Sequence, residues 1–160
     1  MPVDFTSVLV ALSRAQVRFV VAGGLAVLLH GLDRLTADID VAIDLGAEPA
    51  RKAIQTLLAL GYRPMAPVDA LELADPLKRS QWQHERGMTV FSFWDPTHTR
   101  PTIDVFLTPV IDFEDLWAQA AQIDLGPTRI RIASREHLIE MKAAAGRPQD
   151  LADIQRLRDR

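Results

Sequence analysis

Two aspartates separated by one residue inside an apolar run are the first sign of chemistry in this sequence. Asp38 and Asp40 flank Ile39, and the residues that follow are typical of a strand. Residues i and i+2 of a strand project from the same face, so the two carboxylates are expected side by side. Ionised groups in an apolar strand are costly unless they are paired or bound to a metal. The pair therefore indicates a metal site, with a solvated strand end or a neighbouring arginine as the alternative.

A third carboxylate interrupts a second apolar run. Asp104 lies within Thr102-Ile103-Asp104-Val105-Phe106-Leu107, which is also typical of a strand. Magnesium prefers oxygen ligands and substrate phosphates. Three aspartates on two strands could hold two Mg²⁺ ions in the way that phosphoryl-transfer enzymes do.

Upstream of the aspartates, Gly23 and Gly24 join an expected strand over residues 18–22 to an expected helix over residues 25–30. Such a turn lets backbone N–H groups approach a phosphate, and the start of a helix favours negative charge. A tight strand-to-helix turn also favours glycine without any ligand. Between the glycines and the aspartates, Arg34 and Thr36 add a cation and a hydroxyl that could address a polyphosphate.

The remaining patterns predict the elements that would position these residues. Apolar spacing and capping residues predict helices over 4–15, 49–61 and 113–121, and two C-terminal helices that start after Ser134 and at Pro148. Further strands are expected over 38–43, 88–93 and 102–107, with a short edge strand over 129–132, whereas 64–87 is expected to be a loop with one short helix. Strands and helices do not alternate strictly, which favours an α/β (α+β) fold with one small mixed sheet flanked by helices.

Composition sets the outer limits. The chain has 160 residues, which fits one domain over 1–160, with a core at about 17–110 and a C-terminal helical part at about 111–160. Hydrophobic residues at 48% and charged residues at 24% exclude wholesale disorder. The absence of cysteine excludes disulfides, thiolate nucleophiles and cysteine metal sites, and the four histidines have no ligand-like spacing.

Charge and hydropathy indicate the environment. The net charge of −3 argues against a protein that mainly coats nucleic acid. The most apolar stretch, residues 19–29, is too short to span a bilayer, and no secretory signal precedes it. We therefore expect a cytoplasmic protein that does not engage a membrane.

Two blocks of the sequence resemble a known family. The run Val21-Ala22-Gly23-Gly24, a spacer of thirteen residues and Asp38-Ile39-Asp40-Val41 resemble the signature of the DNA polymerase β-like nucleotidyltransferase superfamily. The spacing of Gly31, Arg34, Thr36, Asp38 and Asp40 is more narrowly similar to the AbiEii-like bacterial group, whose members include toxins of toxin–antitoxin pairs. The stretch 142–154 is similar to the second signature of that group, with Lys142, Arg147, Asp150 and Asp153.

The resemblance implies roles for these residues. Asp38, Asp40 and Asp104 would form the catalytic, metal-binding triad, and Lys142 would act with them by pointing at the triphosphate. Gly23 and Gly24 would cradle phosphates with support from Arg34 or Lys142, while Asp150 and Asp153 would orient Lys142, Arg147 or the substrate. Acidic residues in the first turns of a helix also complement its dipole without any catalytic reason.

The resemblance also implies a reaction and its participants. A Mg²⁺-dependent nucleotidyltransferase would move a nucleoside monophosphate from an NTP to an acceptor hydroxyl, using two Mg²⁺ ions, with Mn²⁺ as a substitute. The acceptor would be a tRNA, a protein or a small molecule, and a toxin of this kind would have an antitoxin partner. The alternative is a non-catalytic nucleotide-binding or partner-binding protein that retains the fold.

We expect other segments of the chain to recognise the acceptor. Much larger members of the AbiEii-like group carry long C-terminal helical regions for their acceptor, whereas this chain ends soon after the second block. Aromatic and basic side chains in two connecting segments are candidates, since such mixtures suit bases and phosphates, although an ordinary solvated loop has the same composition. These residues are Arg79, Trp82, His84, Arg86, His98 and Arg100.

Overall fold

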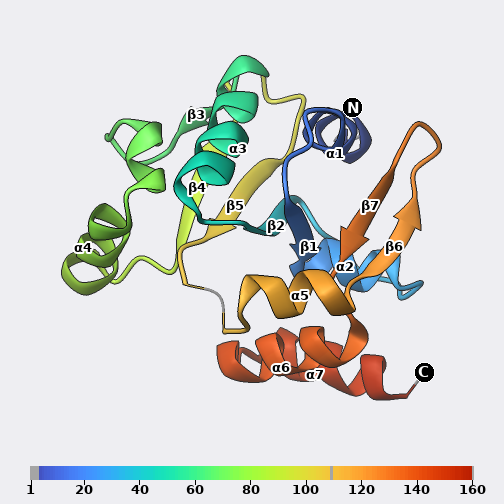
Figure 1. Ribbon diagram of the computed structural model, residues 1–160. Coiled ribbons are helices and arrows are strands. Elements are labelled where there is room, and N and C mark those ends of the chain that lie inside the picture. The colour runs from blue at the N-terminus through green and yellow to red at the C-terminus, as the bar shows by residue number, and fades with distance from the viewer. Residues whose placement is uncertain (1–3, 109, 160) are drawn as a thin grey trace.

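One mixed sheet organises the computed structural model, which describes residues 4–108 and 110–159 (Figure 1). Its strands follow the order β3-β4-β5-β2-β1-β7-β6. Their bounds are β1 (Phe19–Ala22), β2 (Asp38–Ile43), β3 (Arg63–Pro64), β4 (Val90–Trp94), β5 (Thr102–Phe106), β6 (Ala121–Asp124) and β7 (Arg129–Ile132). The predicted mixed α/β fold is confirmed.

The centre of the sheet places the aspartates on neighbouring strands. β2 runs antiparallel to β1 and parallel to β5. In this register Asp40 lies beside Ala22 on one side and beside Asp104 on the other. The glycine turn that follows Ala22 and the two strands with carboxylates therefore meet at one place.

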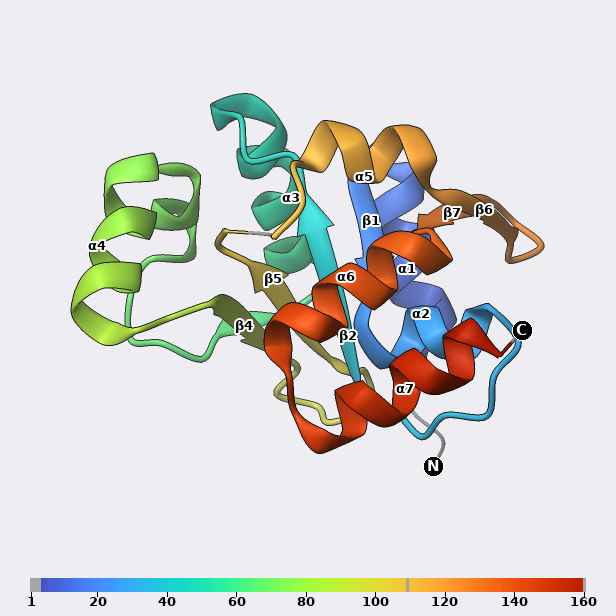
Figure 2. The same cartoon turned by 90° about the horizontal axis from the view of Figure 1, so that it is seen from below.

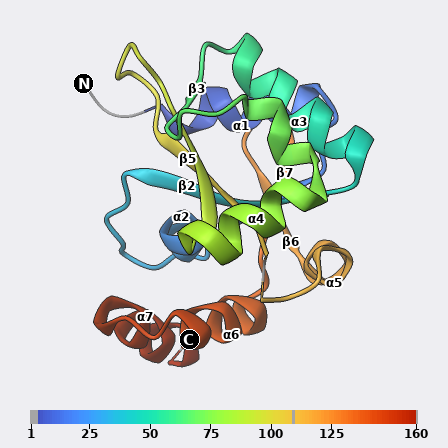
Figure 3. The ribbon, with the colours of Figure 1, turned by 90° about the vertical axis from the view of Figure 1, so that its left-hand side faces the viewer.

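The two faces of the sheet have different neighbours. Val41 of β2 and Ile103 and Val105 of β5 are buried toward α1 (Phe5–Arg14) and α3 (Ala47–Ala59), which lie on one side of the sheet (Figure 3). The alternate residues of these strands, which include the aspartates, point to the other side. Alternation along β2 and β5 thus separates an apolar core face from a polar face.

Helices of the C-terminal part cover the polar face. α6 (Arg135–Ala145) contacts both α2 (Gly23–Leu29) and α7 (Pro148–Arg158), and α6 and α7 lie across this side of the sheet in the view from below (Figure 2). Their ends follow the predicted capping. The Ser134 hydroxyl accepts a hydrogen bond from the backbone N–H of His137, Gly146 ends α6 in the left-handed conformation, and Pro148 begins α7.

Residues 64–87 are more regular than predicted. A 3₁₀ helix, η1 (Ala70–Ala74), precedes the eleven-residue α4 (Pro76–Arg86), so the prediction of a loop with one short helix was wrong. Asp75 caps α4, Pro76 occupies its first turn and Gly87 ends it with φ of +61°. The charged side chains of α4 hid its helical character, because Trp82 is its one buried residue within the described chain.

The C-terminal edge of the sheet also differs from expectation. β7 is an interior strand between β1 and β6, whereas an edge strand was predicted. β6 starts at Ala121, so α5 (Phe113–Gln119) ends earlier than the predicted helix over 113–121. In the described ranges every helix is too short or too polar to cross a membrane.

Candidate active site

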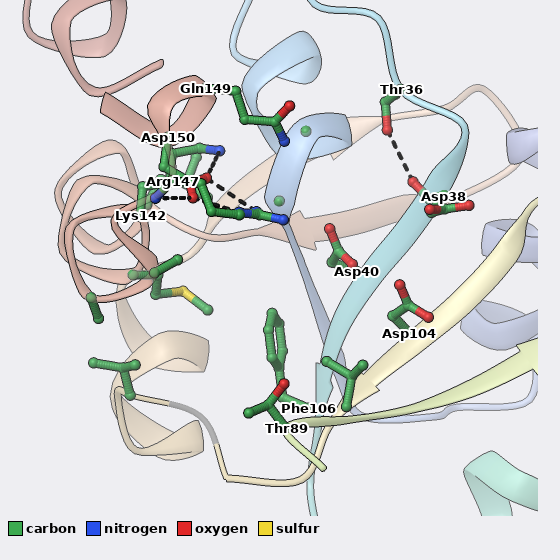
Figure 4. A pocket seen from close by; sticks show the side chains of 18 of the residues that line it. Thr36, Asp38, Asp40, Thr89, Asp104, Phe106, Lys142, Arg147, Gln149 and Asp150 are labelled. Carbon is green, nitrogen blue, oxygen red and sulfur yellow. Dashed lines mark hydrogen bonds and ion pairs between the residues drawn. The ribbon is translucent and has the colours of Figure 1, made fainter. Parts of the chain in front are cut away.

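A cleft of about 680 Å³ lies between the polar face of the sheet and the C-terminal helices (Figure 4). Its lining contains all ten residues that the sequence selected as catalytic or ligand-binding. They are Gly23, Gly24, Arg34, Thr36, Asp38, Asp40, Asp104, Lys142, Arg147 and Asp150. The fold therefore gathers these residues from four separate stretches of the chain, while their individual roles stay predictions.

The three aspartates line the floor of the cleft. Asp40 and Asp104 are register partners on parallel strands, and Asp38 lies two residues before Asp40 on the same face of β2. Oδ1 of Asp104 accepts a hydrogen bond of 2.5 Å from the hydroxyl of Ser92, its register partner on β4. Sequence reasoning missed Ser92, although its position in the alternation of β4 places it on this face.

The electrostatics of the aspartates favour a bound cation. Desolvation raises the pKa of Asp40 to about 6, with further contributions from the charges of Asp104 and Asp38, and against the opposing effect of Arg147 and Lys142. Desolvation and the charge of Asp104 also raise the pKa of Asp38. The charge of Asp104 thus makes ionisation of Asp38 and Asp40 less favourable, and a cation would relieve this repulsion.

The donor set fits magnesium in its chemistry. Carboxylate oxygens are hard ligands of the kind that Mg²⁺ takes. Within residues 4–108 and 110–159, no three His, Asp or Glu side chains are already grouped closely enough to hold a metal ion. Binding would therefore require Asp38, Asp40 and Asp104 to turn toward a common centre, and the metal triad stays a prediction.

Gly23 allows Asp40 to reach its position. The residue has φ of +62°, and a Cβ atom there would lie 1.9 Å from Oδ2 of Asp40. A Cβ atom on Gly24 would lie 3.2 Å from Oγ1 of Thr36. The turn between β1 and α2 therefore packs directly against the site, which explains the first glycine without a ligand. A phosphate-binding role for the two glycines stays a prediction.

A network of buried charges closes the other side of the cleft. Lys142 is 5% exposed. Its Nζ atom lies 2.8 Å from Oδ2 of Asp153 and 3.7 Å from Oδ1 of Asp150. Oδ2 of Asp153 also accepts a bond of 3.1 Å from Nε of Arg34. The network ties the segment before β2 to the two C-terminal helices, and it gives the buried amine of Lys142 two carboxylate partners.

Arg147 forms the exposed end of this network. Its Nε donates to Oδ2 of Asp150 at 2.7 Å, and its backbone N–H donates to the same oxygen at 3.1 Å. Burial opposes ionisation of Asp150, but these hydrogen bonds hold its pKa below the ordinary value. The bond to Asp150 raises the pKa of Arg147. Both groups are thus ionised at neutral pH.

The side chains considered for acceptor recognition lie outside the cleft lining. Arg79 donates to the carbonyl of Leu73, and the Trp82 ring is buried against Phe91. His84 and Arg86 belong to the last turn of α4. Near β4, the His98 ring packs on Trp94 and Arg100 donates to the carbonyl of Leu60. Acceptor recognition by these segments therefore has no support in the structure.

The structure instead adds cleft residues that the sequence did not single out. Gln149 lies beside Arg147 and Asp150, whereas Phe106 and Thr89 lie below Asp40 (Figure 4). Met141 joins them from α6. For Phe106 a signal existed, since it stands two residues after Asp104 on the same strand face. An aromatic residue in a strand is more often part of the core, so that signal is weak.

A family comparison matches nearly the whole chain. The family described as "Nucleotidyl transferase AbiEii toxin, Type IV TA system" matches residues 7–159. A comparison with curated proteins gives no match.

Solved structures share the fold at low sequence identity. Lincosamide antibiotic adenylyltransferase LnuA, solved with lincomycin bound, is 17% identical with a TM-score of 0.61, covering 99% of this chain and 98% of that chain. ANT(2")-Ia in complex with adenylyl-2"-tobramycin is 17% identical with a TM-score of 0.54, and the match covers 94% of this chain and 82% of that chain. An antigenic nucleotidyltransferase-like protein from Paracoccidioides brasiliensis is 16% identical, with a TM-score of 0.55 and coverage of 98% and 78%.

Proposed function

We propose that this chain, which belongs to the AbiEii family of nucleotidyltransferase toxins, uses the cleft to move a nucleoside monophosphate from an NTP to an acceptor hydroxyl. The pairing of Asp40 with Asp104 opposite the buried Lys142 is the observation that carries this proposal. It supplies negative ligands for a cation on one side of the cleft and fixed positive charge on the other. A nucleoside triphosphate with its metal ions has the charges to fill that space.

The cationic side of the cleft would receive the triphosphate. Lys142, Arg34 and Arg147 are held in place by Asp153 and Asp150, so little reorganisation is needed when charge develops on the leaving pyrophosphate. The backbone of Gly23 and Gly24 would add N–H donors beside Asp40. Fixed charges of this kind stabilise a transition state better than mobile ones.

The acidic side would receive the metal ions and the acceptor. Asp38, Asp40 and Asp104 would hold two Mg²⁺ ions, which when bound neutralise phosphate charge and lower the pKa of an attacking hydroxyl. Because the Ser92 hydroxyl donates to Oδ1 of Asp104, it would hold one oxygen of this carboxylate while the other turns toward the ions. Asp104 would then orient the acceptor hydroxyl and receive its proton.

The acceptor defines the biological role. The family description names a toxin of a toxin–antitoxin system, which supports a cellular acceptor such as a tRNA or a protein, and an antitoxin partner. LnuA, which this chain matches over nearly its full length, is an antibiotic adenylyltransferase, and this supports a small-molecule acceptor. The two acceptor classes differ in size and are separable by experiment.

Labelling experiments test the reaction and its acceptor together. The protein is incubated with each of four α-labelled NTPs, Mg²⁺ and extract from its source cells, and RNA, protein and small molecules are then separated. We expect label in one fraction, and its loss with EDTA or with Asp104→Ala. Absence of label in every fraction with every NTP, from protein that is folded, would contradict the proposed reaction.

A further inference from the structure

The cleft has two halves of different chemistry. Toward α7 it is lined by Arg34, Lys142, Arg147 and Asp150. Near the start of β4 and the end of β5, the described lining is uncharged. It consists of apolar side chains and two hydroxyls, among them Val90, Phe106, Val110, Met141, Thr89 and Thr108. This second half offers no charge to a triphosphate, so it is suited to a less polar part of a substrate.

Phe106 is the central side chain of the uncharged half. It lies two residues after Asp104 on β5, which places it about 7 Å farther along the same face of the strand. Its register partner is Val90 of β4, which also lines the cleft. Figure 4 shows the ring standing in the cavity below Asp40. Phe106 is half-buried, so part of the ring is available to a ligand.

α6 supplies the opposite wall. Leu138, Met141, Lys142 and Ala145 recur at helical spacing, share one face of α6 and line the cleft. Leu138 is fully buried beneath the others, whereas Met141 is half-buried. The face that directs Lys142 to the charged half thus directs Met141 to the uncharged half. Phe106 and Met141 together bound a site suited to a flat ring, because methionine sulfur and aromatic rings both contact π-systems favourably.

The direction of the reaction assigns an occupant to this half. In phosphoryl transfer the attacking oxygen and the leaving group are in line at phosphorus, so the remaining substituent, here the nucleoside, lies to the side. Figure 4 places Lys142 and Arg147 on one side of Asp40 and Asp38 on the other, with Phe106 off this line. We propose that the uncharged half binds the nucleobase of the NTP, with the base stacked on Phe106. This inference rests on the proposed function.

The side chains of this half would recognise the face of a base and not its edge. Thr89 and Thr108 provide its hydroxyl groups, and a hydroxyl both donates and accepts. Stacking tolerates every base because each has a π-face. Loss of the Phe106 ring should therefore weaken the binding of all four nucleotides together.

Calorimetric titration of the full chain with Mg²⁺ tests this assignment. The probes are the α,β-methylene analogues of ATP, GTP, CTP and UTP, together with inorganic tripolyphosphate, which has no base. Phe106→Leu keeps apolar volume without the ring, and Phe106→Tyr keeps the ring. Trp94→Leu is the matched control, since Trp94 is a half-buried aromatic residue of β4 outside the cleft lining.

We expect Phe106→Leu to weaken each analogue about 5- to 100-fold, with unchanged tripolyphosphate affinity. Trp94→Leu should bind the analogues as the natural protein does, and Phe106→Tyr, which keeps the stacking ring, should weaken them less than Phe106→Leu. Equal weakening of tripolyphosphate, no weakening, or weakening for one base alone would overturn the assignment. If the natural protein binds neither the analogues nor tripolyphosphate, the proposed function itself fails. If it binds both and Phe106→Leu matches it, the nucleobase assignment alone fails.

Discussion

Asp40 and Asp104 lie side by side as register partners on the parallel strands β2 and β5. The arrangement is unfavourable in the absence of a cation, because desolvation and the charge of Asp104 both oppose ionisation of Asp40. Groups that destabilise the fold in this way are common in functional sites. The stability of the protein should therefore respond to pH and to Mg²⁺ through Asp40.

Asp40→Asn should stabilise the metal-free protein at neutral pH. The pKa of Asp40 is about 6 in the fold, above its ordinary value, so the folded state holds the proton more tightly than the unfolded state. The free energy of unfolding therefore falls by about 1–3 kcal/mol between pH about 4, below which both states are protonated, and pH about 6, above which both are ionised and the loss stays constant. Urea unfolding of both proteins in EDTA from pH 4 to 8 measures the difference.

In Mg²⁺ we expect the natural protein to be more stable than Asp40→Asn, the reverse of the order in EDTA. A ligand that binds the folded state raises the free energy of unfolding of the natural protein, and Asp40→Asn removes one of the proposed ligands. Asp33→Asn is the control, because Asp33 is exposed and outside the cleft lining. If Asp40→Asn raises the free energy of unfolding in EDTA by the same amount at every pH from 4 to 8, the electrostatic explanation is wrong.

Lys142→Ala should destabilise the fold strongly. It leaves Asp150 and Asp153, which are 1% and 2% exposed, without their shared lysine. Breaking a buried ion pair costs about 3–5 kcal/mol, and we expect the lower end because Arg147 and Arg34 still contact the two acids. Arg51→Ala breaks the exposed pair with Glu48 and should cost less than about 1 kcal/mol. Urea unfolding measures both variants. If both lose a similar amount of unfolding free energy, the Lys142 network contributes little to stability.

The candidate site could be predicted to a large extent because its residues lie in short local patterns. Gly23, Asp38 and Asp40 are close in sequence, and strand alternation alone assigns the two aspartates to one face. The contact between Arg34 and Asp153 joins segments far apart in the chain, and it depends on how α7 docks, which no local pattern determines. Phe106 remained hidden because a core phenylalanine and a cleft phenylalanine occupy the same position in a strand pattern.

In the fold, too, elements with a clear local pattern could be predicted, and elements without one could not. Helices with an apolar stripe and clear caps, such as α1 and α6, follow from periodicity, and their predicted positions are confirmed. α4 buries Trp82 alone among its described residues, so it has almost no apolar stripe to detect. β6 has four residues and is half-exposed, so its own pattern is weak. It is a strand because it pairs with β7 in an antiparallel hairpin.

Ser92→Ala should lower turnover about 10- to 100-fold, the range typical of residues that orient metal ligands. The hydroxyl fixes one oxygen of Asp104, so its loss should affect kcat more than KM for the NTP. Asp104→Ala should lower turnover further, since it removes a carboxylate of the site itself. Steady-state kinetics of labelled NTP transfer measures both, and Ser80→Ala on the exposed surface of α4 is the control. Equal activity of Ser92→Ala and Ser80→Ala would remove Ser92 from the site.

Gly23→Ala should abolish activity beyond its effect on stability. Gly23 and Gly87 both have positive φ, +62° and +61°, so alanine at either position strains the backbone by about 1–2 kcal/mol. At Gly87 a Cβ atom meets nothing within 4 Å, whereas at Gly23 it would lie 1.9 Å from Oδ2 of Asp40 and would force that carboxylate out of position. Comparing the two variants therefore separates backbone strain from displacement of Asp40. We expect similar losses of unfolding free energy, a further loss of transferase activity of at least about 100-fold in Gly23→Ala, and near-natural activity in Gly87→Ala. Equal activity in both variants would show that transfer does not depend on the position of Asp40.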